Sequence, residues 1–551
     1  MDNFWMEHVK QTTPRMNPDI ANGLAVKMMP KALEHLDAVT RSVAKDFIPG
    51  LRYIGFELCT PEEELRKVNP KKNDKYVIET AKSSLYLTKL KLAYTDPKAV
   101  DVRTGKLANV EEELDPCYIY VPYVGPAGRM YLSGAQYFLS PILADVVLSF
   151  EKDCIFLNLL RAKFGIRDIR HIVLKNGIHE EHKILWSNIY HVDDSEIIDK
   201  IETRPESTLV NYLFCYKGLY NTFKDYAGCT PIIGTKDINE DNYPQSDYVI
   251  YESAKQKLKG SKYQIFTPYK VAIKKSELNT SVEGFVAALF YLLDHFPDEF
   301  RQIEWLNDSR KWRLILGRII FGKSRNAGTI LEAIDDHFKS LDQYLDTIVK
   351  YKLESINIFV DNIYDFFAHA VHNYKEWSFK SKENLNSIYE KELSVLHYTL
   401  SEIVNSINTF YFKLKSTYKT SDKRPLTKED INKIVRSVIK PKRIYAIKDS
   451  PSGLSNMAYP GDNMFMKITS NVIPQKSLSK TGNDEIDIGD PVNFLHESFM
   501  AIGSHLNLPK SSPIGYRTLS PYTMLDKDNK FIIDPEEKKY LDNVHEIIRR
   551  K

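Results

Sequence analysis

The sequence predicts an α+β fold with several domains, in which β-rich N-terminal and C-terminal regions flank a middle domain of long helices. Three observations predict this class. The chain has 551 residues, enough for about three or four domains at roughly 100–200 residues each. Short β-like runs dominate residues 51–150 and return after residue 419. Between them, from 284 to 418, apolar residues recur with helical spacing.

These changes of pattern divide the chain into five expected regions. They are an N-terminal helical segment (1–50), a β-rich domain (51–150), a mixed α/β region with hairpins (151–283), a helical domain (284–418) and a loop-rich β/α C-terminal domain (419–551).

The strand-rich regions are predicted from alternation and from turn residues. Leucines alternate with other residues in SSLYLTKLKLAYTD, CYIYVPYV is a second short β run, and RMYLSGAQYFLS is a strand pair after a GPAG turn. Further on, RHIVLKNGIHEEHKILW predicts a hairpin that turns at Asn176-Gly177, a dipeptide that favours two-residue hairpin loops.

The helical domain is predicted from two apolar stripes whose members lie three or four residues apart. The first consists of Ile330, Ile334, Phe338, Leu341, Leu345 and Ile348, and the second runs over eight turns through Leu385, Tyr389, Leu393, Leu396, Leu400, Ile403, Ile407, Phe410 and Leu414. Stripes of this length are typical of the core between packed helices. A polar stretch, 416–430, then ends the domain.

Composition restricts the class of protein. The formal net charge is only +3, so binding to nucleic acid would depend on local basic patches. The five cysteines are odd in number and form no C-x-x-C pair, which argues against a zinc ribbon or a disulfide framework and favours a reducing compartment. We see no signal peptide and no apolar run near the ~20 residues of a membrane helix. We therefore expect a cytosolic (cytoplasmic) or particle-bound protein, without membrane contact.

The sharpest motif is GRIIFGKS, which matches the phosphate-binding pattern G-x-x-x-x-G-K-[ST] with Gly317, Gly322, Lys323 and Ser324. Its four middle residues are bulky, however, and the preceding stretch predicts a helix that Ser309 caps and Gly322 ends. The end of an amphipathic helix is therefore our main interpretation, and a nucleotide-binding loop is the minor one.

One predicted helix carries Asp361, Asp365, His369 and His372 on a single face. That spacing would suit half of a carboxylate–histidine metal site. Because apolar residues fill the opposite face, a solvated helix surface is the simpler interpretation.

Basic residues near two turns of the C-terminal region are candidates for contacts with nucleic acid. Lys440, Lys442 and Arg443 lie in VIKPKRIYAI, whereas Lys510 and Arg517 lie in LPKSSPIGYRTLSPY. Basic side chains interleaved with aromatic residues and rigid turns suit contact with a phosphate backbone. A solvated loop rim is the alternative explanation.

Two stretches resemble the β subunit of multisubunit DNA-directed RNA polymerases. The run SSLYLTKLKLAYTD … CYIYVPYVGPAGRMYLSGAQYFLS is similar to the N-terminal half of that subunit, where a strand pair leads to a short apolar strand, a turn and two further strands. PKSSPIGYRTLSPYTMLDKDNKFIIDP resembles the segment that follows the β-subunit fork. The resemblance covers about 75–140 and 505–535, and before Pro513 this chain has Lys510, Ser511 and Ser512 where the family has an acidic residue.

The resemblance implies one piece of a split β subunit, of the kind that bacteriophages encode. Such a noncatalytic piece would hold DNA, RNA and other polymerase subunits, while the catalytic Mg²⁺ would bind to another chain. On this chain we expect no catalytic residue, cofactor or metal site. Two alternatives stay open, namely a virion structural or assembly protein that packs through its long helices, and a P-loop NTPase.

Overall fold

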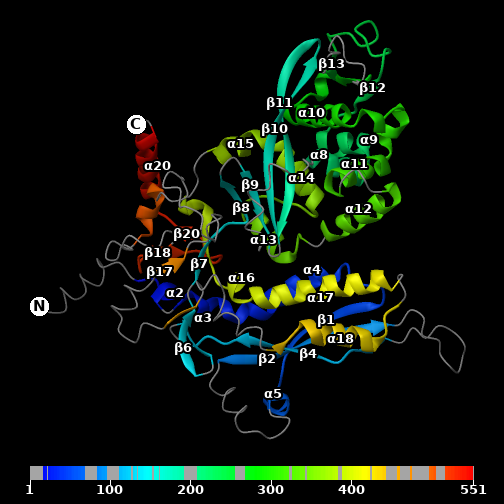
Figure 1. The fold of residues 1–551 in the computed structure, drawn as a ribbon. Coiled ribbons are helices and arrows are strands. Elements are labelled where there is room, and N and C mark those ends of the chain that lie inside the picture. The colour runs from blue at the N-terminus through cyan, green and yellow to red at the C-terminus, as the bar shows by residue number, and fades with distance from the viewer. Residues whose placement is uncertain are drawn as a thin grey trace, which may run out of the picture. The chain divides into compact units, whose positions relative to one another are not determined.

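The chain folds into two compact units, each built from segments that are distant in the sequence. Unit 1 comprises Met1–Val146, Asp346–Ile348 and Asn386–Lys551, whereas unit 2 comprises Val147–Leu345 and Val349–Leu385. The computed structural model describes residues 16–21, 23–68, 84–95, 111–125, 128–132, 134–139, 141–151, 154–159, 162–191, 208–254, 267–321, 326–341, 344–382, 387–421, 425–441, 456–458, 472–474, 496–503 and 516–549. Many helices and several sheets occur in them, which confirms the multi-domain α+β class (Figure 1). The boundaries of the five expected regions stay predictions.

The largest sheet of unit 1 is antiparallel and has β2 at its centre. Its strands are β1 (Leu51–Leu58), β2 (Leu85–Thr95), β3 (Glu111–Glu113) and β4 (Cys117–Pro122). One edge of β2 pairs with β1, and the other edge pairs with β3 and β4. The predicted strand pair that follows is also confirmed, because β5 (Arg129–Leu132) pairs with β6 (Ala135–Leu139).

Shorter strands complete the sheets of unit 1. They are β7 (Ile142–Asp145) with β15 (Lys391–Ser394), β16 (Asn456–Ala458) on β6, β17 (Val472–Pro474) with β18 (Tyr516–Thr518), and β19 (Met524–Leu525) with β20 (Phe531–Ile532). Strands from the two ends of the chain therefore pair with each other.

Helices of unit 1 come from both ends of the chain as well. They are α2 (Pro18–Ala21), α3 (Leu24–Met28), α4 (Ala32–Ala44), α5 (Pro61–Val68), α16 (Leu396–Thr399), α17 (Ser401–Thr420), α18 (Lys428–Val438) and α20 (Pro535–Arg549), with 3-10 turns η1 (Met29–Lys31), η8 (Ile388–Glu390) and η11 (Glu497–Ala501). α4 packs on β1, and α17 packs against both α4 and α18 (Figure 1). The Tyr411 hydroxyl donates to Asp46 at 2.5 Å and so ties α17 to the residues that follow α4.

The predicted continuous helix from Leu385 to Leu414 is wrong in its first half. The chain instead forms η8, the strand β15 and the short helix α16 before α17 begins at Ser401. The cause is a strand partner that helical spacing cannot reveal. β15 pairs with β7, and Lys391 forms an ion pair with Asp145 at 2.5 Å, 246 residues away along the chain.

Unit 2 contains a seven-stranded sheet whose longest part is the predicted hairpin. Its strands are β8 (Leu148–Glu151), β9 (Cys154–Asn158), β10 (Ala162–Lys175), β11 (Ile178–His191), β12 (Ile232–Gly234), β13 (Tyr248–Ser253) and β14 (Lys270–Lys274). β10 and β11 pair along their full length around a turn at Asn176 (φ 49°) and Gly177 (φ 79°). Positive φ at both turn residues is typical of the twisted two-residue hairpin turn that Asn-Gly favours.

Helices bury the apolar surface of this sheet. They are α8 (Leu209–Lys217), α9 (Leu219–Thr222), α10 (Thr280–His295), α11 (Ser309–Phe321), α12 (Ala327–Leu341), α13 (Thr347–Glu354) from Val349 on, α14 (Ile363–His372) and α15 (Tyr374–Lys382). A π-helical turn, η4 (Phe223–Ala227), and the 3-10 turns η5 (Lys275–Glu277), η6 (Pro297–Glu299) and η7 (Ile303–Asn307) connect them. α8 and α10 pack on β11, and α15 packs on β8 and β9. Trp312 lies fully buried in this core, and its indole N–H donates to the Leu306 carbonyl at 2.7 Å.

The first five residues of GRIIFGKS belong to α11, so the helix that the sequence predicted there is confirmed. Gly317 is buried against α12, because a Cβ atom at this position would lie 2.2 Å from Cγ2 of Ile330. A phosphate-binding loop instead needs its backbone N–H groups open to the ligand. Gly322, Lys323 and Ser324 lie outside the described residues.

Candidate functional site

The candidate site lies on the solvent-exposed side of α18 in unit 1. Its inner side buries Ile431, Ile434, Val435 and Val438, spaced three, one and three residues apart as an amphipathic helix requires. Lys433, Arg436 and Ser437 are exposed on the other side. Lys440 is exposed two residues after the helix ends. The solvent-exposed face of α18 is therefore basic over the last two turns of the helix.

Sequence determines where this helix begins and how its charges are arranged. The Thr427 side chain accepts from the Asp430 N–H, while the Asp430 carboxylate accepts from the Thr427 N–H, which forms a capping box. The hydrogen bond from the Thr427 hydroxyl is the main cause that lowers the pKa of Asp430. Glu429 and Asp430 lie in the first turn and the basic residues follow, as the helix dipole favours.

Contacts with the large sheet hold α18 in place. Lys428 pairs with Glu112 of β3 at 2.8 Å, and Arg436 pairs with Asp115. The Tyr94 hydroxyl donates to the Leu426 carbonyl at 2.8 Å, just before the helix begins.

The end of α18 is held by a buried cysteine. The Cys117 thiol lies 3.9 Å from the Ile439 carbonyl oxygen, to which it donates. Burial raises the pKa of Cys117 to about 12, so this thiol stays protonated and keeps its donor. Lys440 therefore leaves the helix from a fixed backbone position.

α17 adds one more cation to this surface. Lys413 donates from Nζ to the Ser437 hydroxyl at 2.8 Å, which brings the lysine beside the basic side of α18. Phe412, next to it on α17, has 55% of its surface exposed. We call Lys413, Lys433, Arg436 and Lys440 the basic surface.

The charges of the basic surface are only partly compensated. Arg436 pairs with Asp115, and Lys433 lies 4.0 Å from Asp430 with 74% of its side chain exposed. Among the described residues, no carboxylate pairs with Lys413 or Lys440. Clustered lysine ammonium groups of this kind attract phosphates without reading the sequence of bases.

The structure brings only one of the predicted nucleic-acid contacts into this site. Lys440 belongs to the basic surface, whereas Lys442, Arg443 and Lys510 lie outside the described residues. Arg517 lies on β18, with its Cα opposite that of Ile473, and its side chain is outside the described part. Sequence reasoning missed Lys413, Lys433 and Arg436, although the spacing of lysine and arginine opposite an apolar stripe on α18 was a usable signal.

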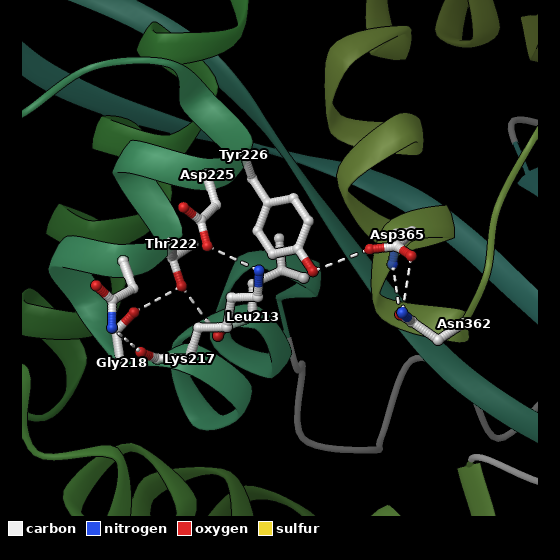
Figure 2. Close-up of polar contacts among 9 residues, drawn as sticks. Leu213, Lys217, Gly218, Thr222, Asp225, Tyr226, Asn362 and Asp365 are labelled. Carbon is white, nitrogen blue, oxygen red and sulfur yellow. Dashed lines mark hydrogen bonds and ion pairs between the residues drawn. The ribbon is translucent and has the colours of Figure 1, made fainter.

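The predicted polar face of α14 makes contacts inside unit 2, as Figure 2 shows for Asp365. The Tyr226 hydroxyl of η4 donates to Asp365 Oδ1 at 3.1 Å, and the Asn362 side chain donates to Oδ2 at 2.7 Å. Burial and the neighbouring Asp365 carboxylate raise the pKa of Tyr226. The Lys217 ammonium lies over the Tyr226 ring and pairs with Asp225 at 2.8 Å. These contacts brace the π-helical turn against α14.

The other members of that face do not converge on one point. His372 shares a 2.5 Å hydrogen bond with the Ser281 hydroxyl, and burial lowers the pKa of His369. The predicted helical face is wrong for Asp361, because α14 begins only at Ile363; the Asp361 carbonyl, ahead of the helix, accepts from the Lys350 side chain. Within the described ranges, no group of three or more His, Cys, Asp or Glu side chains is arranged to hold a metal ion.

Comparison with known proteins identifies the family. The family model described as non-virion RNA polymerase subunit matches residues 4–546, which is nearly the whole chain. The chain therefore belongs to this family of RNA polymerase subunits, and its partners are other polymerase subunits. The match confirms the predicted polymerase subunit but does not assign it to the β subunit. No curated protein matches the chain.

In the part of the chain that the structure describes, no helix combines the length and the apolar character that a crossing of the membrane requires.

Proposed function

We propose that this chain is a noncatalytic subunit that contacts the nucleic acid backbone inside a viral DNA-directed RNA polymerase. The basic surface carries this proposal, because Lys413 of α17 contacts Ser437 of α18, while Lys433 on α18 and Lys440 just after it are exposed. Helix-borne lysines hold a phosphate backbone by charge and so position it without base specificity. The chain belongs to a family of RNA polymerase subunits, so this contact would act within an assembled polymerase.

The resemblance to the β subunit supports a finer role. Along the chain, β2 precedes β4, β5 and β6 as the resemblance implies for the N-terminal half of that subunit, with the three-residue strand β3 inserted after β2. In such a role the chain would help to hold DNA and RNA, and Mg²⁺ would act on another chain. Lys442 and Arg443 come after Lys440 in the sequence, separated from it by Pro441 alone, and would extend the same contact.

The two alternatives have less support. A virion assembly protein finds no support in a family of non-virion polymerase subunits. For an NTPase, the helical state of Gly317–Phe321 removes part of the loop that would hold phosphates.

The salt dependence of DNA binding tests the proposal. We expect the assembled polymerase that carries Lys413→Ala, Lys433→Ala and Lys440→Ala together to bind DNA with a shallower dependence on salt. Each lost phosphate contact should lower the slope of log K against log salt by about 0.9, so roughly 2.7 in total. Titration of labelled DNA at four salt concentrations measures the slope.

Lys428→Ala is the matched control, because Lys428 lies in the first turn of the same helix, does not belong to the basic surface and already pairs with Glu112. It removes one charge and should leave the slope unchanged. If the triple variant and the wild type have equal slopes, the basic surface does not contact DNA.

A further inference from the structure

Exposed apolar side chains gather at the C-terminal end of unit 1. Met500, Tyr522, Met524, Ile532, Tyr540 and Ile547 each expose between 46% and 65% of their surface. They lie on η11, on the β19–β20 hairpin with the turn before it, and on α20. Single exposed apolar residues are common, whereas several exposed apolar side chains on neighbouring elements are typical of a surface that contacts another molecule.

The hairpin part of this surface is rigid. Met524 and Ile532 lie directly opposite each other on β19 and β20 and therefore project to the same face. Asn17 holds the preceding turn, since its N–H donates to the Pro521 carbonyl and its side chain to the Thr523 carbonyl, both at 2.8 Å. A surface that is ordered before binding loses little entropy when a partner docks.

α20, which begins three residues after β20 ends, carries an apolar stripe of its own that is largely exposed among the described residues. Leu541 is buried and fixes the helix to unit 1, where α20 packs on η11. Tyr540, Val544 and Ile547 are spaced four and three residues apart, so they share a second side of the helix. Tyr540 is 65% and Ile547 is 59% exposed.

Carboxylates border this stripe at its N-terminal end. Asp534 caps α20 by accepting from the Glu536 N–H at 2.8 Å, and Glu536 and Glu537 are exposed one turn before Tyr540. Lys538 is directed elsewhere, over the Tyr389 ring at 4.7 Å. An occupant of the stripe would therefore meet apolar side chains beside a negative edge.

We propose that α20 and the β19–β20 hairpin form a docking surface for another subunit of the same polymerase. The segment that occupies it has an apolar side that covers Tyr540, Val544 and Ile547, and lysine or arginine side chains that face Asp534, Glu536 and Glu537. The acidic edge would repel the negative backbone of DNA or RNA, which favours a protein as the occupant. This docking surface is separate from the basic surface and does not depend on it.

Co-purification with the other polymerase subunits tests the docking surface. We expect the full chain with Tyr540→Glu and Ile547→Glu, co-expressed with those subunits, to bind its partner at least tenfold more weakly, because exposed tyrosine and isoleucine anchors are replaced by charges. The melting temperature of the isolated full chain should stay unchanged, since both side chains are exposed. Lys539→Glu with Glu546→Lys changes charges on another side of α20 and should leave binding intact.

Neutralising the acidic edge of α20 provides a second test of the docking surface. Glu536→Gln with Glu537→Gln should weaken partner binding at low salt and have little effect at about 1 M salt, where the Debye length is only ~3 Å. Unchanged partner binding by the Tyr540→Glu, Ile547→Glu variant would overturn the proposal. So would a dimer of the isolated chain that this variant converts to a monomer, because the occupant would then be a second copy.

Discussion

Replacing Lys391 by methionine is expected to destabilise unit 1 by about 3–5 kcal/mol, the usual cost of removing one partner from a buried ion pair. Lys391 and Asp145 lie 2.5 Å apart, and their side chains are only 8% and 13% exposed. The substitution leaves the Asp145 carboxylate in this dry environment without its ammonium partner. Hydrogen exchange of the β7 and β15 amides measures the loss, and exchange should accelerate by about a hundredfold or more.

Two further variants separate the ion pair from other effects. Lys391→Met combined with Asp145→Leu removes both charges and should recover most of the lost stability. Lys433→Met makes the same side-chain change at a position that is 74% exposed and should have little effect. If the β7 and β15 amides are equally protected from hydrogen exchange in the Lys391→Met variant and the wild type, the ion pair contributes nothing to the pairing of the two strands.

Gly317→Ala is expected to destabilise unit 2 by about 2–3 kcal/mol, although alanine is the better helix former by about 1 kcal/mol. The added Cβ would lie 2.2 Å from Cγ2 of Ile330 and 2.9 Å from Cγ1 of Ile334, so α11 and α12 would have to separate. Urea denaturation followed by tryptophan fluorescence measures the change, because four of the five tryptophans, including the buried Trp312 of α11, belong to unit 2.

Gly328→Ala is the matched control on α12. Its Cβ would make only an ordinary contact, 3.5 Å from the Asn326 side-chain oxygen, so this variant should gain up to about 1 kcal/mol. If the two substitutions change the free energy of unfolding in opposite directions, the result supports a packing role for Gly317. A stabilised Gly317→Ala variant would contradict it and would reopen the interpretation of GRIIFGKS as a loop.

Local patterns in the sequence predicted the local structure well. Asn176-Gly177 fixed a hairpin because its backbone preference needs no distant partner. The helix before Gly322 was predicted correctly from its apolar face, which lies within the helix. The predicted cap was wrong, because Ser309 is the first helical residue and the Asp308 side chain accepts from the Arg310 N–H instead. The strands of 85–139 were visible for the same reason, since alternation reports directly on a half-buried strand.

Features that depend on distant residues could not be predicted in this way. β15 interrupts an unbroken helical stripe because β7, far back in the chain, supplies its partner. The basic surface likewise needs Lys413 from one helix and Lys433 from the next, and only the fold shows that Ser437 brings them together. The sequence suggested Lys440 but offered no reason to join it with Lys413.

Photocrosslinking tests the contact with nucleic acid most directly. A photoreactive amino acid replaces Lys433 on the basic surface in one assembled polymerase, and Lys428, on another side of α18, in a second. Bound to labelled DNA and then irradiated, the first complex should yield a crosslink between this chain and the nucleic acid, and the second should yield little or none. A polymerase that transcribes normally but gives no crosslink at position 433, or gives equal crosslinks at both positions, would contradict the proposed role of the basic surface.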